Sequence, residues 1–309
     1  LYQHQWLLSA VPDKPQSLSS IAEKLADYDV IFFGELHTHP AIHLAQMELL
    51  QALQQHNVNL TLSMEQFERD GQIYIDDYLA GKIGEKYLIK QARAWDNYPS
   101  SYRPLLEYAR HHQLPVIAAN APKRAVLCVA RKGLEILDKM PDSKRQHIAQ
   151  TIDTSAGEYY DQYMAFLTKN SSHGASRATK QKDNDSMSKI MQTMGQRSFA
   201  AQAVRDDTMA ESIAHHLQNN PQRQVLHLNG SFHSNGHLGT VERLAKRLPE
   251  LKIAVISPIS ESEQADIRDK KQLQQDEVFL LVQELPQLFI QDKHRTKWSH
   301  EVLKKRMAN

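Results

Sequence analysis

The stretch from residue 30 to residue 119 most constrains the fold, because short apolar runs alternate in it with longer helical patterns. Three runs rich in β-branched, aromatic or aliphatic side chains, at 30–33, 60–64 and 115–119, are typical of strands. Between the first two, residues 40–55 carry apolar side chains at helical spacing. Such alternation predicts βαβ units. We therefore predict an α/β fold, a mainly parallel β-sheet flanked by helices.

The alternation stops after residue 122. Residues 123–218 carry helical patterns and no convincing strand, so we predict a helical insert there. The remaining strands are expected at 224–229, 253–256 and 278–282. This organisation predicts an α/β core domain formed by residues 1–122 and 219–309, with 123–218 as a small second domain.

Polar side chains directly follow four of the predicted strands. They are Glu35 and His37, Glu65, Asn120 and His233. Because the carboxyl ends of parallel strands share one edge of a sheet, these groups can converge there. Carboxylates and imidazoles suit a divalent metal site, or metal-free acid–base catalysis by Glu35, His37, Glu65 and His233. No spacing matches a zinc motif such as H-E-x-x-H, and each residue alone could equally be structural.

Composition narrows the class of protein. The chain has 309 residues, 41% of them hydrophobic, and a net charge of +1, which argues against a nucleic-acid-binding protein. Its one cysteine, Cys128, excludes an internal disulfide. Because the sequence starts at Leu1, we expect a segment upstream to have been removed, and a signal peptide is one candidate. Residues 1–20, with Pro12 and Pro15, are expected to be loosely held.

The end of the chain is basic. Residues 292–309 contain six Lys or Arg and two Asp or Glu. A solvated tail is the simpler interpretation, and contact with anionic lipid headgroups is the alternative.

An ordered series of motifs resembles the ChaN family of haem-binding, iron-regulated lipoproteins of Gram-negative bacteria. The series opens with Gly34-Glu35-Leu36-His37, followed by His43 and Gln46, and continues with Met64-Glu65-Gln66-Phe67 and Gln72. Its later members are Trp95, Tyr98, 104–110, Pro115-Val-Ile-Ala-Ala-Asn120, His173-Gly174, Ala201-Gln202, Arg205-Asp206, Met209-Ala210 and Asn229-Gly-Ser-Phe-His233. The chain departs from the family pattern in having one His, not two, before Gly174, and in its additional His237.

The resemblance implies haem as the cofactor and a role in iron and haem uptake. It also implies a lipid anchor at the periplasmic face of the outer membrane, an outer-membrane haem receptor as a partner, and a homodimer on haem binding. Within the insert, the candidate haem-binding residues are Tyr159, Tyr160, Tyr163, His173, Met191 and Met194. Phenolate and imidazole ligate ferric haem iron, and methionine can line an apolar slot. Half-buried aromatic residues, a surface turn and core packing are the ordinary interpretations of the same residues.

Two other functions remain open. The Gly-Glu-x-His motif also occurs in a wider group that resembles erythromycin esterases and Tiki-type proteases. A hydrolase would use Glu35, His37, Glu65 and His233, with or without a metal. The chain could also be a scaffold of hydrolase ancestry without chemistry. The resemblance favours haem binding and transport over an enzyme.

Overall fold

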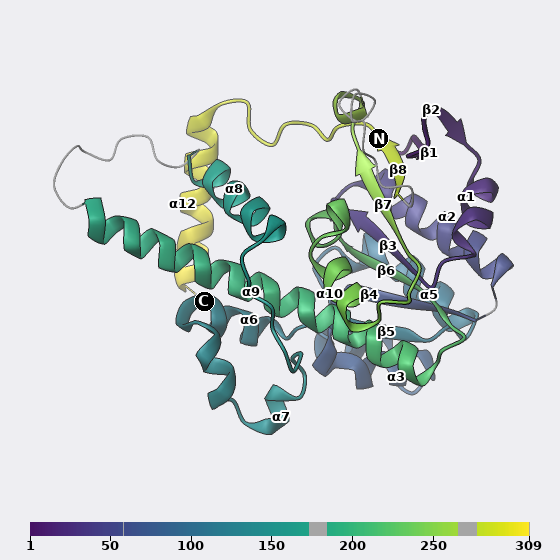
Figure 1. The fold of residues 1–309 in the computed structure, drawn as a ribbon, viewed down its shortest axis with the longest axis horizontal. Coiled ribbons are helices and arrows are strands. Elements are labelled where there is room, and N and C mark those ends of the chain that lie inside the picture. Colours follow the sequence, from purple (N-terminus) through teal and green to yellow (C-terminus); the bar gives the residue numbers. More distant parts are fainter. Residues whose placement is uncertain (58, 173–183, 265–276, 309) are drawn as a thin grey trace.

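A computed structural model describes residues 1–57, 59–172, 184–264 and 277–308 of the chain (Figure 1). The strands are β1 (His4–Leu8), β2 (Val11–Gln16), β3 (Val30–Glu35), β4 (Leu60–Glu68), β5 (Val116–Asn120), β6 (Gln224–Gly230), β7 (Ile253–Ile259) and β8 (Glu277–Val282). The longer helices are α1 (Leu18–Leu25), α2 (Pro40–His56), α3 (Gln72–Leu79), α4 (Glu85–Gln91), α5 (Arg103–His111), α6 (Lys123–Lys132), α8 (Glu158–Ser172), α9 (Asn184–Asn219), α10 (Thr240–Arg247) and α12 (Asp292–Ala308). Short helical turns lie at Arg69–Gly71, Tyr98–Tyr102, Leu134–Lys139, Asp142–Arg145 (α7), Ser231–His233 and Asn235–His237.

The eight strands form one sheet in the order β2-β1-β8-β7-β3-β6-β4-β5. Strands β3 to β8 pair in parallel, and β1 pairs antiparallel with β2 and β8. The predicted α/β class is therefore confirmed. The crossover order places β3 and β6 side by side in the middle of the sheet, so their carboxyl ends are neighbours.

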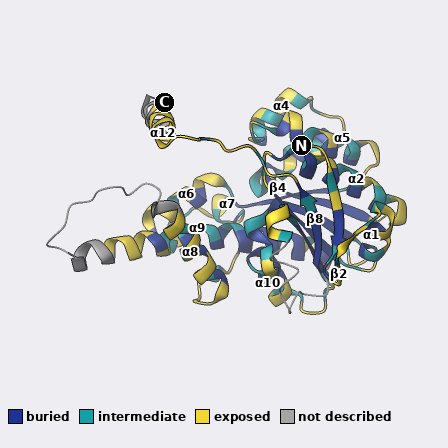
Figure 2. Cartoon of the chain, turned by 90° about the horizontal axis from the view of Figure 1, so that it is seen from above, coloured by how far each residue is buried: buried dark blue, intermediate teal, exposed yellow. Residues whose placement is uncertain are grey.

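Helices cover both faces of the sheet, and the central strands are buried (Figure 2). Because successive side chains of a strand point to opposite faces, β3 contributes to two cores. Ile31 and Phe33 pack with side chains of α1, α2 and α5, while Val30 and Phe32 pack with side chains of α9 and α10. Burial on both faces explains why the strands read as continuous apolar runs.

The expectation of a loosely held N-terminus is wrong. Residues 4–16 form the hairpin of β1 and β2, and Trp6 and Leu7 are buried. Pro12 and Pro15 lie in β2, the edge strand of the sheet. Proline cannot donate a backbone hydrogen bond and is tolerated at a sheet edge for that reason, so the two prolines did not exclude a strand.

The described residues between β5 and β6 are helical or irregular, as predicted. Helix α9 packs through its C-terminal half on the sheet, where Ala210, Ile213 and Leu217 meet Val30 and Phe32. Its N-terminal half projects from the sheet next to α8 (Figure 1). Whether 123–218 is a domain of its own stays a prediction.

Candidate functional site

Glu35, the last residue of β3, is a buried carboxylate that accepts four hydrogen bonds. Its Oε1 accepts from His37 Nδ1 (2.7 Å), Gln66 Nε2 (3.0 Å) and the Tyr102 hydroxyl (2.6 Å). Its Oε2 accepts from Gln46 Nε2 (2.6 Å). A carboxylate satisfied in this way remains an acceptor and fixes its neighbours.

His37 is the neighbour that reaches solvent. Its side chain is 42% exposed, and its ring edge packs at right angles against Trp95, 4.8 Å away between centroids. The backbone carbonyl of His37 accepts from Asn97 Nδ2 and His43 Nε2. Burial alone would lower the pKa of His37, but the hydrogen bond to Glu35 and the nearby carboxylate charges raise the pKa overall. With Nδ1 directed at Glu35, Nε2 is the nitrogen left for a ligand or substrate.

Glu65 lies on the other side of Gly230, the last residue of β6. The Gly230 amide donates to Glu65 Oε2 (2.6 Å). A Cβ atom at position 230 would lie 2.9 Å from His37 Nε2 and 3.6 Å from Glu65 Oε2. A side chain at position 230 would therefore have to displace the His37 ring. Asn120, at the end of β5, donates to the Glu65 carbonyl.

His233 is buried between two carboxylates. Its Nδ1 donates to Asp206 Oδ1 (2.6 Å), and its Nε2 lies 3.5 Å from Glu65 Oε1. Burial alone would lower the pKa of His233, but the charges of Asp206 and Glu65 raise the pKa to about 10. Burial would likewise raise the pKa of Glu65, but the His233 charge outweighs burial and holds that pKa well below its usual range. The two carboxylates therefore favour the protonated form of His233.

The structure therefore brings the four predicted catalytic residues together at one edge of the sheet. We call Glu35, His37, Glu65 and His233 the Glu/His cluster. In it the solvent-facing imidazole of His37 is bound to the fully hydrogen-bonded carboxylate of Glu35, and the buried His233 lies between Glu65 and Asp206, which is outside the cluster as defined. Among the described residues, no group of three or more His, Cys, Asp or Glu is arranged to hold a metal ion. The catalytic role of the cluster stays a prediction.

The predicted haem-binding residues lie on α8 and α9. The Tyr159 hydroxyl is buried and donates to Asp206 Oδ2 (2.7 Å), and burial followed by the Asp206 charge raises the pKa of Tyr159. The Tyr163 hydroxyl bonds Ser198 (2.7 Å), and burial raises its pKa too. Tyr160 is half-buried, and its ring packs edge-on against Phe199. His173 lies outside the described residues.

Two methionines in the N-terminal half of α9 face solvent. Met191 is 63% exposed and Met194 66%, and Ile190 beside them is also exposed. Phe166 of α8 is exposed on the same pair of helices. Lone apolar side chains at a surface are common, but several gathered on one projecting pair of helices are typical of a binding surface.

A cavity of about 530 Å³ lies at the base of these helices. Tyr160 lines it together with Leu134, Phe199, Ala200 and Arg197. Met194 and Ile190 lie one and two helical turns from Arg197 along α9. The exposed apolar side chains therefore continue from this cavity along α9.

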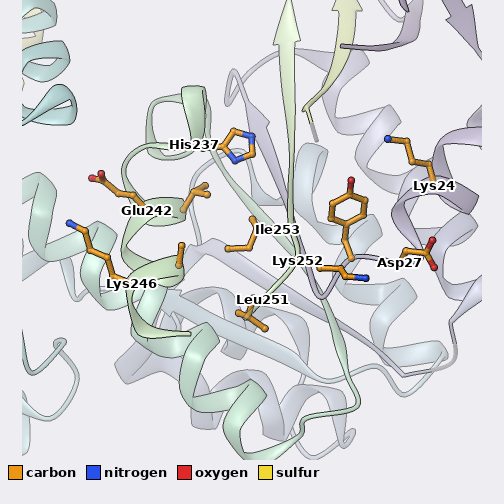
Figure 3. Close-up of a pocket in the computed structure, with 11 residues that line it drawn as sticks. Lys24, Asp27, His237, Glu242, Lys246, Leu251, Lys252 and Ile253 are labelled. Atoms are coloured by element: carbon orange, nitrogen blue, oxygen red, sulfur yellow. The ribbon is translucent and has the colours of Figure 1, made fainter. Parts of the chain in front are cut away.

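A larger cavity of about 1070 Å³ lies elsewhere, between α10, the end of α1 and the start of β7 (Figure 3). It has an apolar floor of Leu251 and Ile253, and its rim mixes cations and anions. Those charged residues are Lys24, Lys246, Lys252, Asp27 and Glu242. Lys246 pairs with Asp153. The cavity contains no residue of the Glu/His cluster.

Four residues of the site were not predicted to belong to it: Gln46, Gln66, Tyr102 and Asp206. Gln46, Gln66 and Asp206 occur in the motif series of the family resemblance, but no local pattern assigns them to the Glu/His cluster. His227 was also missed. It lies buried behind the site, bonds Ser63, and burial lowers its pKa to about 3.

Comparison with known proteins supports the resemblance. A family model described as haem-binding uptake, Tiki superfamily, ChaN matches residues 21–244. A structure of cofacial haem binding to ChaN of Campylobacter jejuni is similar with a TM-score of 0.63 and 15% identity, covering 90% of this chain and 96% of that one. An erythromycin esterase, EreC, in its open conformation has a TM-score of 0.46 and 14% identity, covering 82% and 77%. No curated protein sequence gives a significant match.

Proposed function

Since this chain belongs to the haem-binding ChaN family of the Tiki superfamily, we propose that it carries haem reversibly in iron and haem uptake. The observation that supports a carrier is the exposed apolar surface of α8 and α9, with Phe166, Met191 and Met194 open to solvent. A haem ring needs an apolar face, an iron ligand and cations for its propionates. A surface held on projecting helices releases its ligand more readily than a closed pocket.

Tyr160 is the tyrosine best suited to ligate the iron. No hydrogen bond of its hydroxyl is found within the described ranges, whereas the hydroxyls of Tyr159 and Tyr163 are already engaged by Asp206 and Ser198. Arg197 lines the same cavity and can pair with a propionate. When bound, haem supplies a ferric iron that phenolate ligates. The residues present therefore fit the group.

We also propose where the chain acts and which partners it has. The chain would work at the periplasmic face of the outer membrane of a Gram-negative bacterium, held there by a lipid anchor. It would receive haem from an outer-membrane receptor. No helix of the part that the structure describes is both long and apolar enough to cross a bilayer. A homodimer that joins two α8/α9 surfaces would shield bound haem from water.

Replacing Tyr160 by phenylalanine is expected to weaken haemin binding at least about tenfold, because the substitution removes the iron ligand and keeps the ring. The Soret band, followed during haemin titration, measures the affinity and reports the loss of phenolate ligation. Tyr87→Phe, which changes an exposed tyrosine on α4, is the matched control. If His37→Ala abolishes binding while Tyr160→Phe does not alter it, haem binds at the Glu/His cluster instead.

A second candidate function is hydrolysis, and one observation favours it. Glu35, held by three further donors, fixes the His37 ring through Nδ1, and the His37 side chain remains 42% exposed. In that position Nε2 can take a proton from water as the hydroxide forms a bond with an acyl carbon. The same proton then passes to the leaving group as its bond to carbon breaks. Glu35 would stabilise the imidazolium that forms between these steps.

His37→Ala is expected to lower any esterase activity about 10²–10⁴-fold, the usual contribution of a general base. Activity should rise with pH through a midpoint above 6.5, because the base must be neutral and its pKa is raised. Turnover of p-nitrophenyl esters by the unmodified chain, by His37→Ala and by the surface control His111→Ala tests this. Absence of turnover by the unmodified chain would end this candidate and leave haem binding untouched.

A further inference from the structure

The chain leaves the sheet after β8 through an extended segment, residues 283–291, and ends in α12. In Figure 2, α12 stands apart from the α/β body at the end of this segment. Within the described ranges, α12 makes no extensive contact with another element. Packing against the other elements of the described ranges therefore does not account for its position.

The segment and helix expose large apolar side chains. Leu288 is 90% exposed, Ile290 88% and Trp298 55%. The rings of Phe289 and Trp298 lie 5.8 Å apart, so the extended segment folds back on the start of α12 at that point. Exposed apolar groups collected within eleven residues are costly in water unless a partner covers them.

Cations lie close to these apolar groups in the sequence. Lys293, Arg295 and Lys297 are exposed on the first turns of α12. Arg295 has a partner in Asp292, but at 3.9 Å and at the surface, where such a pair contributes little. Three further cations follow in sequence at 304–306, against one acid, Glu301. The segment is therefore basic as well as apolar.

We infer that residues 286–308 dock on a membrane surface that contains anionic lipids. Lys and Arg are attracted to anionic headgroups, and tryptophan favours the boundary between headgroups and acyl chains. Leu288 and Ile290 would add apolar contact area at that boundary. Two copies of the segment would bring like charges together, so a membrane is the better partner. The inference does not depend on haem binding.

Flotation of the 309-residue chain with vesicles tests the inference. Binding is expected to phosphatidylcholine vesicles that contain phosphatidylglycerol, to weaken with added salt, and to be at least about tenfold weaker without the anionic lipid. Binding should shift the emission of Trp298 to shorter wavelength, and brominated lipids should quench it. Trp298→Phe should remove most of the spectral change, because of the other two tryptophans Trp6 is buried in the sheet and Trp95 is half-buried against His37 and Tyr102.

Reversing three charges on α12, and three elsewhere, tests whether the position of the cations matters for vesicle binding. Lys293→Glu, Arg295→Glu and Lys297→Glu together should lower binding about tenfold. A control triple with the same charge change, Lys86→Glu, Lys90→Glu and Lys132→Glu, alters exposed cations of α4 and α6 and should keep binding. Equal losses in both triples would show that net charge alone drives binding and would overturn the inference. Equal binding to neutral and anionic vesicles would also overturn the inference. Concentration-dependent self-association through α12 without any vesicle binding would overturn it as well.

Discussion

Replacing Glu35 by leucine is expected to lower the free energy of unfolding by about 3–5 kcal/mol, as when one member of a buried charged network is removed. The substitution leaves four donors without their acceptor in a buried place. Of these, Gln46 and Tyr102 are themselves fully buried, so water cannot replace the carboxylate. Repulsion between Glu35 and Glu65 does not offset this loss, because imidazoles and amide donors surround both carboxylates.

Urea denaturation measures this effect. Glu23→Leu, which makes the same change on the exposed side of α1, should alter stability by no more than about 0.5 kcal/mol. Glu35→Gln keeps the shape and should cost less than Glu35→Leu, because the amide oxygen still accepts from some donors. If Glu35→Leu were as stable as the unmodified chain, Glu35 would be a strained functional group, and the structural role described above would be wrong.

Replacing Asp206 by asparagine is expected to cost about 3–5 kcal/mol near pH 6, since it leaves His233 buried with one carboxylate instead of two. Asp206 is the acceptor shared by His233, Tyr159 and Thr240. It joins the Glu/His cluster to α8 and to the start of α10. The loss should therefore be global, visible in the whole unfolding transition.

The loss of stability in Asp206→Asn should depend on pH. The folded pKa of His233 is raised to about 10, above the ordinary 6.5, so its charge stabilises the folded chain fully below pH 6.5. That stabilisation is lost as pH rises from about 6.5 toward 10. The difference between the unmodified chain and Asp206→Asn should shrink over the same range. Asp161→Asn changes an exposed residue of α8, so its free energy of unfolding should differ from that of the unmodified chain by a small amount that does not depend on pH. If the difference for Asp206→Asn were large but independent of pH, the positive charge assigned to His233 would be wrong.

Much of the fold could be predicted from local pattern. The apolar run at 30–33 marks a central strand, because a strand buried on both faces is apolar, and the polar residues after the run mark its functional end. The convergence of Glu35, Glu65 and His233 followed from the rule that parallel strands share a carboxyl edge. The hairpin of β1 and β2 could not be predicted from the local sequence pattern. Its prolines argue against a strand until the edge position is known.

The rest of the site could not be predicted, because its supporting groups come from helices. Asp206 is one of several acids along α9, and only the packing of α9 on the sheet brings it to His233. Tyr102 reaches Glu35 from a short helical turn 67 residues along the chain. Helical periodicity indicates which face of a helix is buried, but it does not identify the strand end that a polar side chain on that face will meet.

The prolines of β2 have a consequence for assembly. An unpaired edge strand can recruit a strand from another molecule, and a row of free backbone donors makes that easy. At Pro12 and Pro15 the backbone of β2 offers no donor, so this edge is a poor template for a continuous sheet between molecules. A partner strand is therefore disfavoured at this edge, which leaves β5 as the other edge of the sheet.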